Sequence, residues 1–257
     1  MLQVDPDWWK RLFDEYYLLT DARSVCDEAL TRREVDFLVA HLALNRDERI
    51  LDLCGGHGRH GLELVRRGYR DVTVVDFSWV LLRYGKRRAA RDRLPVRFVR
   101  SDARWVGCAP ARFDCILMLA NSFGYFLDDR ENLRVLQEAR RVCRPRGRVL
   151  LDLLDREEVV RRFRPFSCHR AAGGMAVTRE RERNETSVRV RETVLADNGK
   201  VVREGVYCER LFTDRDLTAL LRAGGFSRFD LHRDFSGHQG AGDYGFMNSR
   251  VIVTARP

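Results

Sequence analysis

The chain has 257 residues, of which 44% are apolar, and this is enough for one large α/β domain with an elaboration. Its net charge of +9 is spread over interspersed arginines and acids, as in residues 180–183 (ERER), a pattern typical of solvated surface rather than of a nucleic-acid site. Seven cysteines without a Cys-x-x-Cys spacing fit neither a disulfide framework nor a zinc site, and no apolar run reaches the roughly 20 residues of a membrane span. The N-terminus shows no signal pattern, so we expect a cytoplasmic protein with no metal, no membrane and no specific nucleic acid among its partners.

Residues 1–45 precede the first predicted strand and are rich in aromatic rings. Asp5-Pro6 predicts a helix start, because proline suits the first helical position. A helix with one broad aromatic face is predicted from the three-to-four spacing of Trp8, Trp9, Leu12, Phe13, Tyr16 and Tyr17. Residues 31–34 (TRRE) predict a capping box for a further helix. The aromatic face either packs into the core or covers a ligand site as a lid.

The most informative stretch is residues 50–65 (ILDLCGGHGRHGLELV), where a short apolar run leads into glycines and then an amphipathic pattern. This order predicts a strand, a tight turn and a helix. Glycine permits positive φ angles and lets a ligand lie against the backbone. The new helix directs free N–H groups at that ligand. We therefore predict a nucleotide-type binding loop at the carboxyl end of a parallel strand.

Two kinds of nucleotide are considered for this loop. The spacing Gly56-x-Gly58-x-x-Gly61 matches the dinucleotide fingerprint, which keeps an NAD(P)-dependent reductase open. Asp52, however, would repel a pyrophosphate and attract an ammonium group. Asp76 follows the next strand, where a carboxylate can bind ribose hydroxyls, and Asp102 follows a third strand. Three strand-end acids beside the glycines suit the amino group, the ribose and the adenine amine of S-adenosylmethionine (SAM).

Beyond the loop, strands and helices alternate as in a doubly wound parallel sheet. The predicted elements are strands 71–75, 96–99, 113–119 and 148–153 and a helix from about 129 to 143. The loop after strand 113–119 would lie at the ligand crevice of such a sheet. Asn121 and Tyr125 in that loop are predicted to contact a substrate.

Residues 165–212 interrupt this alternation. Apolar and polar residues alternate in three segments, and Asn198-Gly199 between two of them predicts a hairpin turn. We expect an antiparallel insertion of about three strands, which forms either a dimer surface or a roof over the substrate.

Residues 213–257 return to the α/β pattern. Thr213 to Asp216 predicts a helix cap, and strands 228–234 and 250–255 complete a seven-stranded sheet. The Gly-rich loop between these strands carries His238, Asp243 and Tyr244, which makes it a candidate substrate loop.

Five segments resemble, in order, the motifs of the Rossmann-type (class I) SAM-dependent methyltransferases: residues 51–60 (LDLCGGHGRH), 75–78 (VDFS), 101–104 (SDAR), 113–116 (FDCI) and 144–148 (RPRGR). The resemblance implies a SAM-binding, Rossmann-like core at 46–164, completed by 213–257, with 1–45 as a helical lid and 165–212 as the insertion. His57 departs from the pattern, because close relatives carry a small residue there. The predicted cofactor-binding residues are Tyr17, Asp52, Gly55, Gly56, Gly58, Asp76, Phe77, Ser78, Asp102, Ala103, Arg104 and Ala120.

The functional prediction is methyl transfer from SAM to a small-molecule acceptor, at nitrogen or oxygen rather than carbon. A hydroxyl or carbon acceptor would need a general base, for which His169, His238 and Tyr244 are candidates. The predicted catalytic residues are His238, Tyr244 and Tyr125, and the predicted substrate-binding residues are Asn121, Tyr125, Tyr16 and His238. The alternatives are a tRNA or rRNA methyltransferase, an NAD(P)-dependent reductase and a non-catalytic SAM-binding regulator, and a homodimer stays open.

Overall fold

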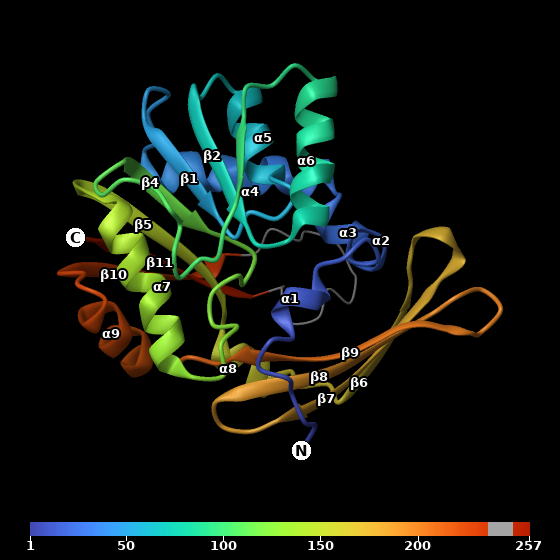
Figure 1. Ribbon diagram of the computed structural model, residues 1–257. Helices are drawn as coiled ribbons and strands as arrows, with labels where there is room; N and C mark the ends of the chain where they lie inside the picture. The colour runs from blue at the N-terminus through green and yellow to red at the C-terminus, as the bar shows by residue number, and fades with distance from the viewer. Residues whose placement is uncertain (236–248) are drawn as a thin grey trace.

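The computed structural model describes residues 1–235 and 249–257 (Figure 1). In these residues the chain forms a seven-stranded sheet flanked by helices and a separate four-stranded sheet. The candidate residues His238, Asp243 and Tyr244 lie outside the described part of the chain. None of the described helices is long and apolar enough to cross a membrane.

The large sheet has the strand order β10-β11-β5-β4-β1-β2-β3. Its paired neighbours are parallel except at β11, which runs antiparallel to both β5 and β10. The strands are β1 (Arg49–Leu53), β2 (Asp71–Asp76), β3 (Arg97–Arg100), β4 (Phe113–Met118), β5 (Cys143–Leu154), β10 (Arg228–Phe235) and β11 (Arg250–Arg256). The predicted doubly wound, mostly parallel sheet of seven strands is therefore confirmed, and the order places a topological switch point between β1 and β4.

Side chains alternate between the two faces of this sheet and so build two cores. Leu51 and Leu53 of β1 pack with α7 and α9, whereas Ile50 packs with α4 and α5 on the opposite face. Helix α6 packs against β2 and β3. The helices are α4 (Glu28–Leu42), α5 (Arg59–Arg66), α6 (Trp79–Arg91), α7 (Asp129–Val142), α8 (Arg156–Arg161) and α9 (Asp214–Ala223).

Side-chain caps fix most helix starts. Ser78 accepts a hydrogen bond from the Leu81 N–H, and Thr213 and Asp216 form the reciprocal capping box that their spacing predicts. The capping box predicted at residues 31–34 is wrong. The cap of helix α4 lies four residues earlier, because Asp27 accepts from the Leu30 N–H and is the cap instead of Thr31.

The N-terminal segment is not the single amphipathic helix that its ring spacing predicts. It forms three one-turn helices, α1 (Trp9–Leu12), α2 (Tyr17–Thr20) and α3 (Ala22–Val25). One local and two tertiary contacts interrupt the helix. Asp14 accepts from the nearby Tyr17 N–H at 3.1 Å, and Arg203 of β9 donates to the Leu12 carbonyl and pairs with Asp14 at 2.9 Å. The rings that were predicted to share one face of a single helix therefore do not lie on one helix.

The insertion forms an antiparallel sheet in the order β6-β7-β8-β9. Its strands are β6 (Phe166–Arg170), β7 (Ala176–Arg183), β8 (Ser187–Leu195) and β9 (Val201–Arg210). There are four strands rather than the expected three, because the short polar edge strand β6 has no clear alternation in the sequence. Figure 1 shows this sheet below the N-terminal helices and extending away from the large sheet.

A buried charge cluster ties the large sheet to α4 and α5. Arg250 of β11 pairs with Glu34 at 2.7 Å and with Asp152 at 3.2 Å. Arg59 and His60 of α5 also contact Glu34. Burial by itself raises the pKa of Glu34, but the neighbouring Arg59, His60 and Arg250 outweigh it and hold the pKa well below its usual range.

Replacing Arg250 with methionine would leave the buried carboxylates of Glu34 and Asp152 short of a cation. Breaking a buried ion pair from one side costs about 3–5 kcal/mol. We expect urea denaturation to show a loss of this size for Arg250→Met. The control Arg256→Met, at the exposed end of the same strand, should change stability by less than about 0.5 kcal/mol. Equal effects of the two substitutions would contradict this role for Arg250.

Candidate functional site

The loop between β1 and α5 lies at the carboxyl end of β1, and contacts with neighbouring residues fix its conformation. Gly56 and Gly58 have positive φ angles of 58° and 72°. The Gly56 N–H donates to Asp76 at the end of β2, at 2.8 Å. A Cβ added at Gly55 would lie 2.6 Å from the carboxyl carbon of Asp52, and one at Gly58 would lie 2.8 Å from the Phe98 ring. The predicted strand, turn and helix are present, and the glycines are required by packing as well as by φ.

Gly85 is a further determinant of this loop, although it lies outside the motif. It sits in α6, and a Cβ at this position would lie 2.4 Å from the carbonyl oxygen of His57. Helix α6 can therefore approach the loop backbone closely only with glycine here. A glycine inside a predicted helix was the only sequence signal for this contact.

We expect Gly85→Ala to push α6 away from the loop, because backbone cannot yield as a flexible side chain does. The substitution should lower the unfolding midpoint and weaken ligand binding at the loop, although alanine favours helix by about 1 kcal/mol. Thermal unfolding with and without ligand measures both effects. Gly205→Ala is the control, since an added Cβ there meets nothing within 4 Å. A more stable Gly85→Ala protein would contradict the packing argument.

The aromatic cavity, of about 60 Å³, opens beside the ends of β2, β3 and β4. Asp76 faces it, with one carboxylate oxygen accepting from the Gly56 N–H and the other from the Ser78 N–H at 2.7 Å. Burial raises the pKa of Asp76 above its usual value. Trp9 meets Phe77 and Phe126 edge to face, with centroid distances of 4.8 and 5.4 Å. The cavity thus combines an anchored carboxylate with ring walls.

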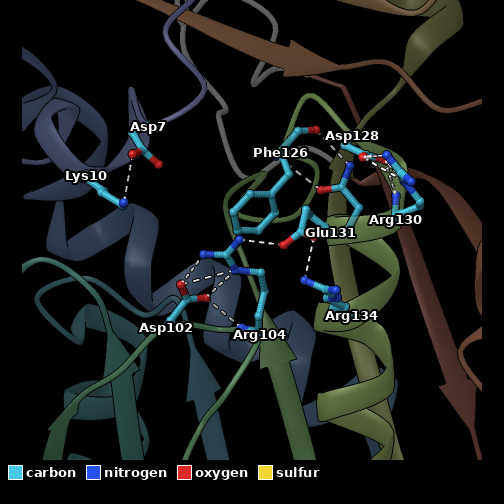
Figure 2. Close-up of polar contacts among 10 residues, drawn as sticks. Asp7, Lys10, Asp102, Arg104, Phe126, Asp128, Arg130, Glu131 and Arg134 are labelled. Atoms are coloured by element: carbon cyan, nitrogen blue, oxygen red, sulfur yellow. Dashed lines mark hydrogen bonds and ion pairs between the residues drawn. The ribbon is translucent and has the colours of Figure 1, made fainter.

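Arg104 does not line the aromatic cavity, but it contacts Asp102 and Phe126, which do (Figure 2). It donates to both carboxylate oxygens of Asp102, pairs with Glu131 at 2.6 Å and lies 4.4 Å from the centre of the Phe126 ring. Burial raises the pKa of Asp102, but the bonds from Arg104 outweigh it and the net pKa lies below its usual value. Since Arg104 already donates to both Asp102 oxygens, an adenine amine that donates to Asp102, as the sequence predicts, would have to share an oxygen with Arg104.

The loop cavity, of about 80 Å³, lies between the glycine loop, the N-terminal segment and residues 119–125. Asp52 lines it, and its two buried carboxylate oxygens have no hydrogen-bond partner among the described residues. Burial raises the pKa of Asp52 to about 7. Burial also lowers the pKa of His57, to about 3, so its ring is neutral. The unsatisfied carboxylate is a ready acceptor for a cationic ligand group.

The corner after β4 holds two consecutive residues in the left-handed region, Ala120 (φ 55°) and Asn121 (φ 56°). Asp152 secures them, because its side chain accepts from the Ala120 N–H and its carbonyl accepts from the Asn121 N–H, each at 2.9 Å. The Asn121 side chain accepts from the Leu154 N–H at 3.3 Å. Strain of this kind is common at ligand sites.

The charged cavity, of about 150 Å³, lies between the N-terminal segment, the large sheet and the four-stranded sheet. Its charged and phenolic lining consists of Tyr17, Asp21, Glu34, Arg59, Tyr125, Arg179, Arg181, Glu192, Tyr207, Glu209 and Arg250. It shares Tyr17, Arg59 and Ala120 with the loop cavity, and Phe13 and Tyr125 line all three cavities. The three cavities are therefore neighbours around Phe13 and Tyr125.

Several predicted residues fall in these cavities and others do not. Tyr17, Ala120, Asn121 and Tyr125 line the charged cavity. Tyr16 lines none of the three cavities. The His169 ring contacts the Thr20 carbonyl at 2.9 Å and likewise lies outside them.

The sequence patterns did not predict the residues of the four-stranded sheet that line the charged cavity. Arg179, Glu192 and Tyr207 line the charged cavity from β7, β8 and β9. One signal was present: Glu192 occupies an apolar position in the alternation of Val188, Val190 and Val194. A charge in an inward-facing row indicates a polar interior.

The fold and the loop at the switch point define a Rossmann-like, nucleotide-binding domain. Residues 50–147 match a family model described as "Methyltransferase domain". A SAM-dependent methyltransferase from Clostridium acetobutylicum has the same fold, with a TM-score of 0.72 and 15% identity over 94% of this chain and 95% of that one. Residues 50–147 are thus similar to a methyltransferase domain, and the chain has the Rossmann-like fold seen in SAM-dependent methyltransferases.

Curated relatives match part of the chain. Identity is 29% over 126 residues with a glycine/sarcosine N-methyltransferase from Halorhodospira halochloris, covering 49% of this chain and 47% of the relative. It is 32% over 135 residues with the ubiquinone/menaquinone biosynthesis C-methyltransferase UbiE of Acidiphilium cryptum, covering 52% and 51%. The chain thus spans about half the length of these relatives.

Proposed function

We propose that this protein is an enzyme that transfers a methyl group from SAM to a small-molecule acceptor, at nitrogen or oxygen. The observation that carries the proposal is that Phe13 and Tyr125 line all three cavities. A cofactor spread along the strand ends would lie in the aromatic and loop cavities. An acceptor in the charged cavity would then meet its reactive group beside Phe13 and Tyr125.

The residues of the first two cavities suit SAM in their chemistry. When bound, SAM supplies an electrophilic methyl group on a sulfonium sulfur. Asp76 would hold the ribose hydroxyls with the lone pairs that Gly56 and Ser78 leave unused. Asp52 would bind the ammonium group of the methionine part, which gives its unsatisfied oxygens a partner. A pyrophosphate at the same place would meet this carboxylate as a like charge, which argues against a dinucleotide.

The acceptor would be enclosed by the N-terminal segment as a lid and by the four-stranded sheet as a roof. Trp8, Phe13 and Tyr17 line the charged cavity from the N-terminal segment, and Tyr207 lines it from the sheet. Enclosure excludes water and aligns the acceptor lone pair behind the methyl group. A cavity of about 150 Å³ suits a small metabolite better than a nucleotide of tRNA or rRNA. The glycine/sarcosine N-methyltransferase relatives act, by their names, on acceptors of this size.

Asp76→Ala should abolish detectable SAM binding and methyl transfer, because it removes the ribose ligand and frees the Gly56 N–H. Calorimetry with SAM and a thermal melt test binding and folding separately. Asp71→Ala, at the opposite end of β2, is the matched control and should bind SAM normally. Unchanged SAM affinity in Asp76→Ala would remove the basis for the proposed cofactor site.

SAM binding should release protons near pH 6. In the free protein Asp52 has a pKa of about 7 and is largely protonated at that pH, whereas a bound ammonium group favours the carboxylate. The affinity for SAM should therefore rise with pH up to about pH 7, because Asp52 loses its proton over this range. Calorimetry at pH 6 in two buffers with different ionisation enthalpies measures the release. Asp52→Asn should abolish it, and release that persists in this variant would assign the proton to another group.

A further inference from the structure

The inner face of the four-stranded sheet is lined with charge. Strand register places Arg181, Val190 and Tyr207 in one row, and the neighbouring rows on this face contain Arg179 with Glu192 and Val188 with Glu209. Arg179, Arg181, Glu192, Tyr207 and Glu209 line the charged cavity. An inward sheet face is ordinarily apolar, so these residues need partners or a ligand.

Most acids around the charged cavity have cationic partners. Asp21 pairs with Arg179 at 2.9 Å, and Glu192 pairs with Arg179 and Arg203, each at 2.6 Å. Glu34 pairs with Arg59 and Arg250. These pairs form two chains of alternating charge that need no further counter-ion.

Glu209 differs from these acids. No hydrogen bond or ion pair joins its carboxylate to a described residue, and the cations that act on it most strongly are Arg181 and Arg179. Glu209 is partly exposed and lines the charged cavity. An enclosed carboxylate without a partner calls for a cationic ligand.

Aromatic rings link Glu209 to Phe13 and Tyr125, which line all three cavities. Tyr207 is two residues from Glu209 on the same face of β9, and its ring lies 5.7 Å from that of Trp8. Trp8 in turn lies 5.0 Å from Tyr125, and Tyr125 stacks on Phe13 at 5.7 Å. Ring faces attract cations, so a wall of rings ending at a carboxylate is suited to an ammonium group.

We propose that Glu209 binds the ammonium group of the acceptor and takes its proton, so that the acceptor is a small amine rather than an alcohol. This inference rests on the proposed methyltransferase function and adds to it the acceptor atom and a catalytic residue. Glu209 lies outside residues 50–147, the range that matches the methyltransferase domain.

The chemistry balances without a further reactant. The ammonium N–H bond breaks, the proton passes to a Glu209 oxygen, and the electron pair stays on nitrogen. That pair forms the bond to the methyl carbon while the carbon–sulfur bond breaks and its electrons stay on sulfur. The products are a methylated ammonium ion and S-adenosylhomocysteine, and the proton on Glu209 returns to solvent. Burial raises the pKa of Glu209, which makes it a stronger base.

The test compares amines with alcohols of the same skeleton: glycine with glycolate, and benzylamine with benzyl alcohol. Formation of S-adenosylhomocysteine from SAM is the readout. The full-length variants are Glu209→Gln, which keeps the shape and removes the charge, and Glu209→Asp, which keeps the charge. Glu204→Gln, an exposed acid on the same strand, is the matched control. Calorimetry with SAM on each protein shows whether the cofactor site is intact.

We expect the wild type to methylate at least one amine and neither alcohol. Glu209→Gln should lower kcat/KM for that amine at least tenfold with unchanged SAM affinity, Glu209→Asp should retain more activity than Glu209→Gln, and Glu204→Gln should match the wild type. Methylation of alcohols as fast as amines, no amine turnover by a wild type that binds SAM, or full activity in Glu209→Gln would overturn the role of Glu209. Failure of the wild type to bind SAM would instead overturn the proposed function.

Discussion

The close contact between the glycine loop and its surroundings is the constraint on which the site depends. Three glycines at this loop leave no room for a Cβ: Gly55 against Asp52, Gly58 against Phe98, and Gly85 against the His57 carbonyl. The Gly56 N–H is fixed by Asp76 from the neighbouring strand. The loop can therefore form only when β1, β2, β3 and α6 are in place, and its position fixes the aromatic and loop cavities at the strand ends.

Buried charge connects this core to the parts that would cover it. One chain of ion pairs runs from α5 and α4 into β11 and β5, and another runs from the N-terminal segment through Arg179 and Glu192 to Arg203. Burying such charges costs several kcal/mol per ion, which is offset only when every partner is correctly placed. The N-terminal segment and the four-stranded sheet are therefore positioned by pairing as well as by apolar packing, and the cavity between them has a defined shape.

The sequence was sufficient to predict the core because its signals are local. The glycine spacing, the strand-end acids and the alternation of apolar residues act within a few residues, and they predicted the large sheet and the residues that line its open edge. Predictions failed for two different reasons. Arg203 helps to interrupt the N-terminal helix from a strand about 190 positions away, and spacing contains no information on such a contact. Asp27 caps α4 through a local bond to the Leu30 N–H, and here two local signals competed, of which the prediction chose Thr31.

Similarity to known proteins can likewise indicate only part of the function. The family match covers residues 50–147, and the loop cavity and the aromatic cavity are built mostly from that range. The groups that would select an acceptor, among them Arg179, Tyr207 and Glu209, lie outside it on the four-stranded sheet. Relatives that share the matched range can thus keep one cofactor chemistry and differ in acceptor, as a glycine/sarcosine N-methyltransferase and a quinone-pathway C-methyltransferase do by their names. Acceptor choice in this chain then has to be inferred from the charges that line its own sheet, and the unpaired carboxylate among them favours an amine.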